Sequence, residues 1–263
     1  MSSTVNASRP VALITGGGSG IGAAIARKLA PTYAVAICGR REDALRSVAS
    51  EMNGLTISAD IAVPDEAAGV IEKVIDHFGR LDALVLNAGI VIPAPVSEMS
   101  IADWQAQIDV NLTAPFVMAK AAIPHLLRTK GAIVTISSVA GATAGAGLAA
   151  YSASKAGATL LTQTIALEYA RHGLRANVIA PGWVRTEMAD MEMAMLADGG
   201  DPELGYQRVT RLVPQRRAAD ASEIANVAAF LLSPHASYIN GALLNVDGGS
   251  SVVNQGLVEF DEA

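Results

Sequence analysis

The sequence TGGGSGIG, Thr15 to Gly22, directly follows the short apolar run 11–14. A loop with this many glycines exposes backbone N–H groups and is typical of phosphate binding. The apolar run predicts a buried β-strand, and residues 21–29 predict a helix. A phosphate would rest on the N-terminus of that helix, where free N–H groups and the helix dipole favour an anion. The alternative is an ordinary strand-to-helix turn without a ligand.

Glycine spacing separates three kinds of phosphate loop. A nucleoside-triphosphate loop carries a Lys-Ser/Thr pair after its last glycine, but Gly22 is followed by AAI. The strict dinucleotide fingerprint G-x-G-x-x-G is also missing, because no register within 16–22 places glycines at i, i+2 and i+5. The pattern present is T-G-x-x-x-G-x-G, formed by Thr15, Gly16, Gly20 and Gly22.

Composition indicates an aliphatic α/β protein. The chain has 263 residues, of which 51% are hydrophobic and only 4% aromatic, which suits helices packed closely on a parallel sheet. The formal net charge is −6 and charged residues make up 17%, so the sequence shows no basic face for nucleic acid. We expect no nucleic-acid partner.

The N-terminal residues 1–10 lack the apolar core of a secretion signal, and no window holds 18 uninterrupted apolar residues. These features predict a soluble, cytoplasmic protein that does not bind a membrane. The single cysteine, Cys38, excludes an internal disulfide framework, and we interpret it as a small buried strand residue. The histidines show no metal-ligand spacing, so we expect no catalytic metal.

Apolar runs of strand length alternate with segments of helical periodicity. The expected strands are 11–15, 34–38, 55–58, 83–86, 132–137, 175–179 and 242–246. The expected helices lie near 20–30, 41–52, 64–78, 100–128, 151–171 and 220–232. This order predicts an α/β fold, a Rossmann-like doubly wound seven-stranded parallel sheet with helices on both faces. No linker divides the chain, so we expect 1–263 to form a single domain.

The stretch 182–213 is too long for an ordinary connection between a strand and a helix, and we expect it to be irregular. It contains a Gly-Gly-Asp-Pro turn at 199–202 and the long apolar residues Met188, Met191, Met193, Met195 and Leu196. Flexible thioethers beside glycines are typical of an adaptable apolar lid, which predicts a substrate lid near 183–213. The alternative is a helix whose methionines pack on the body of the protein or on another subunit.

Ligands of an open parallel sheet bind beyond the carboxyl ends of its strands. The second strand is followed by Arg40 and Arg41, where a cofactor without a 2′-phosphate is often met by an acidic residue. Two guanidinium groups offer paired donors to a phosphate and favour NADP(H) over NAD(H). The alternative is a solvated helix start in which Glu42 and Asp43 balance the charge.

Polar and small residues follow the third and fourth strands. Asp60 and Ile61 follow the third, where the carboxylate either binds an adenine edge or only caps a helix. Asn87, Ala88 and Gly89 follow the fourth and are small enough for their backbone to approach a ligand. Each signal is weak alone.

Tyr151 and Lys155 are four residues apart, which places both side chains on one face of a helix. A tyrosine with a pKa of about 10 is a poor base at neutral pH, but a neighbouring cation stabilises its phenolate. The pair therefore predicts an acid/base group that exchanges a proton with a substrate oxygen, which the hydroxyl of Ser138 would hold. Tyr-x-x-x-Lys alone is common by chance, and its position after a strand end makes it informative.

In this context the chain resembles the short-chain dehydrogenase/reductase family over nearly its full length, in the branch of the 3-oxoacyl-carrier-protein reductases. The matching features appear in the family's order and spacing: Thr15-Gly16, Gly20-Ile21-Gly22, Asp60, Asn87-Ala88-Gly89, Asn111, Ser138, Tyr151, Lys155, Pro181-Gly182 and Asp247-Gly248-Gly249. The chain departs from the family at Thr32-Tyr33, where a glycine is frequent, and in its acidic tail 257–263.

The resemblance implies a catalytic tetrad of Asn111, Ser138, Tyr151 and Lys155. In it Tyr151 exchanges the proton and Ser138 orients the substrate oxygen. Lys155 lowers the pKa of the tyrosine and holds the nicotinamide ribose, and Asn111 holds a water linked to Lys155. Together with the strand-end residues, the expected cofactor contacts are Gly16, Ser19, Gly20, Ile21, Arg40, Arg41, Asp60, Ile61, Asn87, Ala88, Gly89, Tyr151, Lys155, Pro181, Gly182 and Thr186.

We therefore expect an oxidoreductase that transfers a hydride between NADP(H) and a ketone or secondary alcohol, with a small-molecule, mainly apolar substrate. Two alternatives stay open: an NAD-dependent alcohol dehydrogenase of the same fold, and a non-catalytic dinucleotide-binding sensor or scaffold. The intact Ser138, Tyr151 and Lys155 argue against the second. The resemblance also implies a homotetramer built through the segments near 100–128 and 151–171 and the C-terminal segment.

Overall fold

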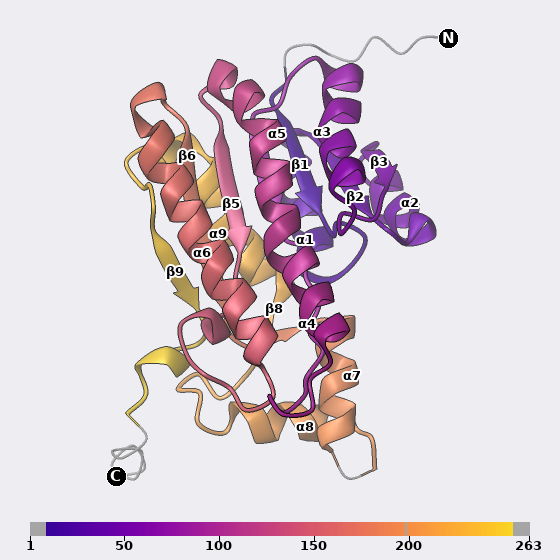
Figure 1. Ribbon diagram of the computed structural model, residues 1–263, viewed down its shortest axis with the longest axis vertical. Helices are drawn as coiled ribbons and strands as arrows, with labels where there is room; N and C mark the ends of the chain where they lie inside the picture. The colour runs from indigo at the N-terminus through magenta and orange to yellow at the C-terminus, as the bar shows by residue number, and fades with distance from the viewer. Residues whose placement is uncertain (1–8, 198, 255–263) are drawn as a thin grey trace.

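A seven-stranded parallel sheet forms the centre of the computed structural model, which describes residues 9–197 and 199–254 (Figure 1). Its strands are β1 (Val11–Thr15), β2 (Ala34–Gly39), β3 (Leu55–Ser58), β4 (Ala83–Leu86), β5 (Ala132–Ile136), β6 (Arg175–Pro181) and β9 (Leu243–Val246). Their order is β3-β2-β1-β4-β5-β6-β9, and every neighbouring pair is parallel. The predicted Rossmann-like sheet is confirmed. The acidic tail 257–263 and residues 1–8 lie outside the described residues.

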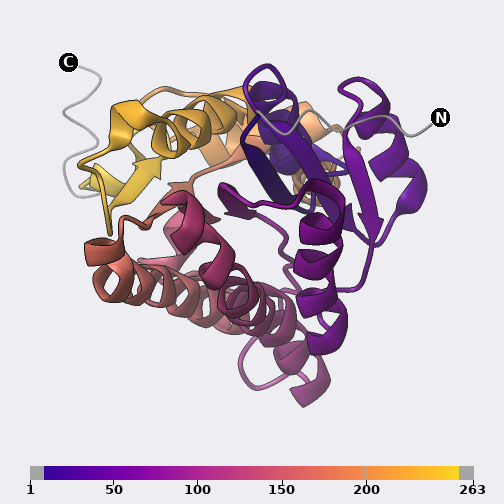
Figure 2. The same ribbon diagram turned by 90° about the horizontal axis from the view of Figure 1, so that it is seen from above.

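Helices cover both faces of this sheet (Figure 2). One layer consists of α1 (Gly20–Leu29), α2 (Glu42–Ser50) and α9 (Ala221–Leu232), and the other of α3 (Pro64–Phe78), α5 (Ala114–Thr129) and α6 (Ala149–Tyr169). Short 3-10 turns are η2 (Val139–Gly141), η3 (Ala170–His172), η4 (Pro234–Ala236) and η5 (Ser250–Val252). The apolar side chains of both layers enclose the sheet in two cores.

Neighbouring residues of β1 show why the central strands are apolar throughout. Leu13 and Ile14 are both fully buried, but they belong to different cores, Leu13 to that of α3 and α5 and Ile14 to that of α1 and α9. Successive strand side chains point to opposite faces, and here both faces are covered. The continuous apolar runs of the sequence therefore follow from double-sided burial.

The expectation that 182–213 is irregular is wrong. The segment contains β7 (Val184–Arg185), α7 (Glu187–Leu196) and α8 (Pro202–Thr210), and β7 pairs in parallel with β8 (Ala219–Asp220). The Thr186 hydroxyl caps α7 by accepting from Ala189 N, and the Asp201 carboxylate accepts from Glu203 N at the start of α8. Local capping chemistry thus forms two helices.

The methionines of α7 differ in their surroundings. Met193 is buried among residues of α7 and α8 together with Ala189 and Tyr206. Met188, Met191 and Met195 are exposed. One methionine therefore packs within this helical segment itself, while the other three are exposed.

The predicted helix near 100–128 is interrupted. It consists of α4 (Ile101–Ile108), a π-helical turn η1 (Asp109–Thr113) and α5. By length and composition alone, the whole span 101–129 would be able to cross a membrane. However, it packs against α3 and α6, and one face of α5 lies in the core with Met118 and Leu126 fully buried. One side of the span thus packs against the core and the neighbouring helices.

Candidate active site

The carboxyl ends of the sheet strands point toward the end of the molecule where α7 and α8 lie (Figure 1). The glycine loop follows β1 at this end. Gly16 N and Gly17 N donate to Cys38 O at 2.8 and 3.3 Å, which ties the loop to β2. Gly16 and Gly20 have φ of +66° and +52°, a left-handed conformation that side chains disfavour. The loop shape therefore requires glycine at these positions.

The start of α1 fits an anionic group. Ser19 stands at the N-cap, but its hydroxyl makes no capping hydrogen bond within the described part of the chain, so the first-turn N–H groups stay available. A Cβ on Gly22 would lie 2.2 Å from Gly16 O, so the loop closes tightly over the helix. This cradle of glycine backbone and helix N-terminus suits the pyrophosphate of a dinucleotide.

Thr15 and Asn87 join the ends of β1 and β4. The Thr15 hydroxyl accepts from the N–H groups of Asn87 and Ala88, both at 2.9 Å, and Asn87 Nδ2 donates to Thr15 O at 2.8 Å. Asn87 therefore holds the glycine loop through its side chain, beyond the backbone role expected from its small size. Thr15, which is present in the motif but not among the predicted contacts, accepts all three of these hydrogen bonds.

Asp60 and Ile61 occupy the turn after β3. Asp60 Oδ1 accepts from Ala62 N at 3.1 Å, so the carboxylate stabilises its own turn. The Ile61 side chain is buried in the core on the α3 face. The turn-stabilising role of Asp60 is thus the one visible in the structure, and adenine contacts of both residues stay a prediction.

Tyr151 and Lys155 lie in the first two turns of α6. Lys155 Nζ is 5.7 Å from the centre of the tyrosine ring and donates to Ile136 O at 2.9 Å. The lysine is buried, and this burial lowers its pKa to about 8. The predicted pair therefore shares one helix face, next to the end of β5.

The surroundings of Tyr151 raise its pKa above the ordinary value. Burial is the largest cause, the nearby Ser138 hydroxyl opposes it, and the charge of Glu192 on α7 acts in the same direction as burial. The net direction is opposite to the effect expected from Lys155, because burial, the largest cause, disfavours the charged phenolate. Glu192 was missed by sequence reasoning, because only the fold brings α7 near α6.

Of two neighbouring hydroxyls, the structure brings Ser138 to Tyr151. Ser138 also caps η2, with its Oγ accepting from Ala140 N at 3.2 Å. Ser137 is buried and donates to Lys155 O at 3.0 Å, with Thr159 Oγ1 at 2.9 Å. Ser137 thus stabilises the packing of β5 on α6, and the contact between Ser138 and a substrate stays a prediction.

Asn111 lies in the π-helical turn and is buried. Its Oδ1 accepts from Ile90 N and its Nδ2 donates to Ile90 O, both at 2.9 Å, and Nδ2 also donates to Ser154 Oγ at 3.1 Å. A Cβ on Gly89 would lie 3.1 Å from Lys155 Nζ and 3.3 Å from Asn111 Oδ1. Asn111 and Lys155 therefore flank Gly89, and Ser154 is a further contact that the spacing did not indicate.

Pro181, Gly182 and Thr186 connect β6 to α7. Gly182 N donates to Val246 O at 3.1 Å, and a Cβ on Gly182 would lie 3.0 Å from Asp247 Cα. A Cβ on Gly20 would lie 3.1 Å from Thr186 Cγ2. The start of α7 consequently lies directly beside the glycine loop.

The two arginines after β2 differ in their contacts. Arg41 donates to Ser19 Oγ at 2.8 Å and to Glu187 Oε2 at 3.3 Å. Arg40 is exposed and forms no ion pair with the residues that the structure describes. Glu42 does not neutralise either arginine, because its carboxylate binds Arg46 at 2.5 Å.

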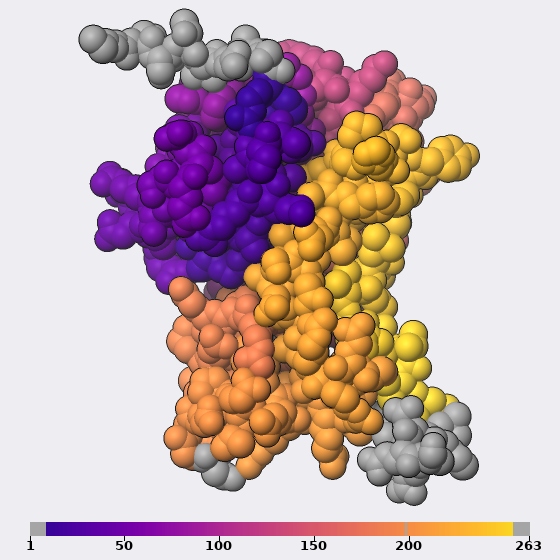
Figure 3. Space-filling view, turned by 180° about the vertical axis from the view of Figure 1, so that it is seen from behind, coloured from indigo at the N-terminus to yellow at the C-terminus, as the bar shows by residue number. Residues whose placement is uncertain are grey.

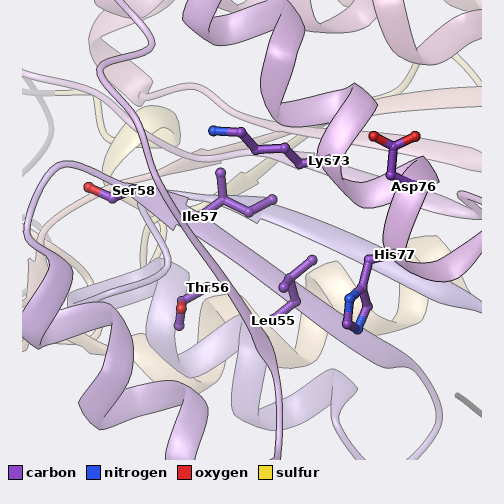
Figure 4. A pocket seen from close by; sticks show the side chains of 7 residues that line it. All are labelled: Leu55, Thr56, Ile57, Ser58, Lys73, Asp76 and His77. Atoms are coloured by element: carbon purple, nitrogen blue, oxygen red, sulfur yellow. The ribbon is translucent and has the colours of Figure 1, made fainter. Parts of the chain in front are cut away.

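One surface depression lies away from this site and contains none of its predicted catalytic residues. A depression of about 460 Å³ lies at the outer edge of the sheet between β3 and α3 (Figure 4). Its lining residues are Leu55, Thr56, Ile57, Ser58, Lys73, Asp76 and His77. None of the predicted catalytic residues lines it. Within 9–197 and 199–254, no three His, Cys, Asp or Glu side chains gather as metal ligands would.

A family model described as enoyl-(acyl carrier protein) reductase matches residues 16–251, which include the glycine loop and the Tyr-x-x-x-Lys pair. The chain belongs to the short-chain dehydrogenase/reductase family. A cis-4-hydroxycyclohexanecarboxylate dehydrogenase of Sinomonas cyclohexanicum is 37% identical and covers 92% of this chain and 97% of its own. A 3-oxoacyl-[acyl-carrier-protein] reductase of Synechocystis sp. is 36% identical, with 91% and 96% covered.

A solved structure, that of levodione reductase, has the same architecture as this short-chain dehydrogenase/reductase. The TM-score is 0.88 at 31% identity, and the match covers 93% of this chain and 98% of that one. The chain is therefore an NAD(P)(H)-dependent oxidoreductase of the short-chain family.

Glu192 provides a pH test of this short-chain dehydrogenase/reductase. Glu192→Gln removes a negative charge that raises the pKa of Tyr151, so that pKa falls. On the predicted role of Tyr151, alcohol oxidation uses its phenolate as base, and the rate rises with pH through the pKa of Tyr151. We expect the rising limb of kcat against pH to move to lower pH in Glu192→Gln. Glu168→Gln, at the opposite end of α6, is the control, and a limb that does not move in Glu192→Gln would contradict the prediction.

Proposed function

We propose that this enzyme transfers a hydride between NADP(H) and a ketone or secondary alcohol, with Tyr151 as proton donor and acceptor. The observation that supports this most directly is that the Tyr151 hydroxyl lies within the influence of the Ser138 hydroxyl and beside the buried Lys155. Two hydroxyls at one point hold one substrate oxygen and exchange its proton. The chemistry that this arrangement serves best is proton transfer to an oxygen on the reacting carbon.

Each residue has a distinct part in this proposal. The nicotinamide cofactor, when bound, supplies or accepts the hydride. In reduction, Tyr151 donates its hydroxyl proton to the substrate oxygen, and in oxidation its phenolate removes that proton. Ser138 donates a hydrogen bond to the same oxygen and fixes its position. Lys155, buried and oriented by Ile136 O, places a cation beside the phenolate.

The preference for NADP(H) rests on the end of β2. Arg40 and Arg41 follow the strand at the position where the adenosine ribose of a Rossmann cofactor lies. Arg41 lies beside the glycine loop through its bond to Ser19, and Arg40 offers an exposed guanidinium. Two such groups favour a 2′-phosphate.

Cofactor binding tests the proposal. We expect the wild type to bind NADPH at least tenfold more tightly than NADH at fixed salt, about 1.4 kcal/mol, and Arg40→Ala/Arg41→Ala to lose this preference. The measurement is calorimetric titration of each cofactor. Equal binding, or tighter binding of NADH, would overturn the NADP(H) proposal and favour an NAD-dependent alcohol dehydrogenase. Failure to bind either cofactor would contradict the whole catalytic proposal.

We propose a small, mainly apolar substrate bound beneath a lid formed by 183–213. The start of this segment lies beside the glycine loop through Thr186, and Glu192 within it acts on Tyr151. Trp183, at the beginning of the segment, is partly exposed and offers apolar surface. The relatives named above include a dehydrogenase and reductases, so both reaction directions occur among them.

We further propose that the enzyme is a cytoplasmic homotetramer. Leu160 and Leu167 are exposed on α6 and stand seven residues apart, on one face of the helix. Phe116 is exposed on the neighbouring α5. Exposed apolar side chains on two adjacent helices favour a subunit interface, and small residues such as Ala153 on the same face of α6 allow close helix approach.

A further inference from the structure

Glu187 brings a carboxylate to the arginine that the proposed function assigns to the 2′-phosphate. Its Oε2 accepts from both terminal nitrogens of Arg41, at 3.3 and 3.4 Å. The same guanidinium donates to Ser19 Oγ of the glycine loop at 2.8 Å. The Glu187 carboxylate thus already contacts the guanidinium group of Arg41, which follows β2.

The contact joins three parts of the chain that meet at the carboxyl end of the sheet. Ser19 belongs to the loop after β1, Arg41 follows β2, and Glu187 begins α7 after β7. In the view of Figure 3, the α7–α8 segment lies below the N-terminal part of the molecule. Thr186 fixes the start of α7 close to Gly20, so the position of Glu187 is set by its neighbour.

The ion pair is weak enough to be exchanged. The side chains of Arg41 and Glu187 are 65% and 66% exposed, and pairs of this kind contribute little to stability. A phosphate binds a guanidinium through several strong acceptor oxygens, whereas the 3.3 and 3.4 Å contacts to one carboxylate oxygen are long. A 2′-phosphate can therefore displace the carboxylate, but it first has to break the existing pair.

We propose that Glu187 is a specificity-determining residue that competes with the 2′-phosphate of the cofactor for Arg41. The inference rests on the proposed use of NADP(H). Glu187 is the first residue of α7 and lies inside the lid segment. On this proposal it affects recognition of the adenosine half of the cofactor, in addition to any effect on the substrate. Glu187 reduces the affinity for phosphorylated cofactors and leaves that for unphosphorylated ones unchanged.

The experiment is calorimetric titration of the full chain with adenosine 2′,5′-bisphosphate and with AMP, which lacks the 2′-phosphate. We expect Glu187→Gln to bind the bisphosphate about 2- to 5-fold more tightly than the wild type, as the loss of a weak exposed pair implies. Binding of AMP should not change. In an Arg41→Ala background the same substitution should have no effect, because the competition is removed.

Glu203→Gln is the matched control. Glu203 forms a similar exposed pair with Arg185 at 2.9 Å in the same segment, without contacting Arg41. Its replacement should leave both affinities unchanged. If Glu187→Gln tightens the bisphosphate equally with and without Arg41, the effect is a general charge effect and the inference is wrong.

The remaining outcomes separate this inference from the proposed function. If the wild type prefers the bisphosphate, Arg41→Ala loses that preference and Glu187→Gln changes nothing, the inference fails while the proposed function stands. If the wild type shows no preference but Glu187→Gln gains one that depends on Arg41, the inference holds and the NADP(H) preference fails. If no variant distinguishes the two ligands, both are wrong.

Discussion

Replacement of Tyr151 by phenylalanine is expected to lower kcat by about 10²- to 10⁴-fold, which is the usual contribution of a positioned proton donor. The ring stays in place beside Lys155 Nζ, and only the hydroxyl that contacts Ser138 is lost. Cofactor affinity should therefore stay within about tenfold of the wild type, or about 1.4 kcal/mol. Steady-state kinetics on a panel of ketones and alcohols, with cofactor titrations, measure both quantities.

Tyr169→Phe is the matched control for this loss. Tyr169 stands on the same helix, α6, and is partly buried against the core on the α3 face, far along the helix from the site. Its variant should keep wild-type kcat. Activity of Tyr151→Phe above one tenth of the wild-type value would be incompatible with proton transfer through this hydroxyl.

The second large effect is expected at the glycine loop. A Cβ on Gly22 would lie 2.2 Å from Gly16 O and 2.5 Å from Asn87 Nδ2, so Gly22→Ala must open the loop. Overpacking of this kind costs about 1–3 kcal/mol, and here both neighbours are fixed by hydrogen bonds to β-strands, so we expect about 3 kcal/mol. Urea unfolding measures the stability loss, and titration with NADPH should show weakened binding.

Gly69→Ala separates this clash from the ordinary effect of alanine in a helix. Gly69 lies inside α3, and a Cβ there meets nothing within 4 Å among the described residues. Alanine should therefore stabilise the protein by up to about 1 kcal/mol through its helix propensity. If Gly22→Ala were as stable as Gly69→Ala, the close contact between α1 and the loop would not exist in solution.

The sheet is predictable from the sequence because its signals are local. Each strand is a short apolar run between turn residues, and burial on both faces keeps the pattern simple. Errors at strand ends are small: β5 ends at Ile136, one residue before its predicted end, and β6 continues to Pro181. The sequence alone therefore places the loop residues after each strand at one end of the sheet.

The segment after β6 was mispredicted because its composition obscured its capping signals. Thr186 and Asp201 are good N-cap residues, and Pro202 follows the second at a favourable first helical position. The methionines and the two glycines at 199–200 suggested an irregular lid instead. Attention to the caps would have found α7 and α8.

The contacts missed within the site are long-range. Glu192 acts on Tyr151 and Glu187 pairs with Arg41 because the segment that follows β6 lies beside the glycine loop. No spacing in the sequence encodes these approaches. Ser154, which hydrogen-bonds to Asn111, lies between Tyr151 and Lys155 in the sequence. The sequence around a helical serine does not indicate which distant residue it contacts.

The π-helical turn 109–113 fixes the length of this part of the chain. Such a turn holds one residue more than the α-helical turn it replaces, so α4 and α5 are out of phase with a continuous helix. Removal of one residue would rotate α5 by about 100° relative to α4. The buried stripe of Met118, Ala122 and Leu126 would then leave the sheet, or Asn111 would turn away from Ile90. The extra residue of the π-helical turn is therefore required both by the core packing of α5 and by the position of Asn111 in the site.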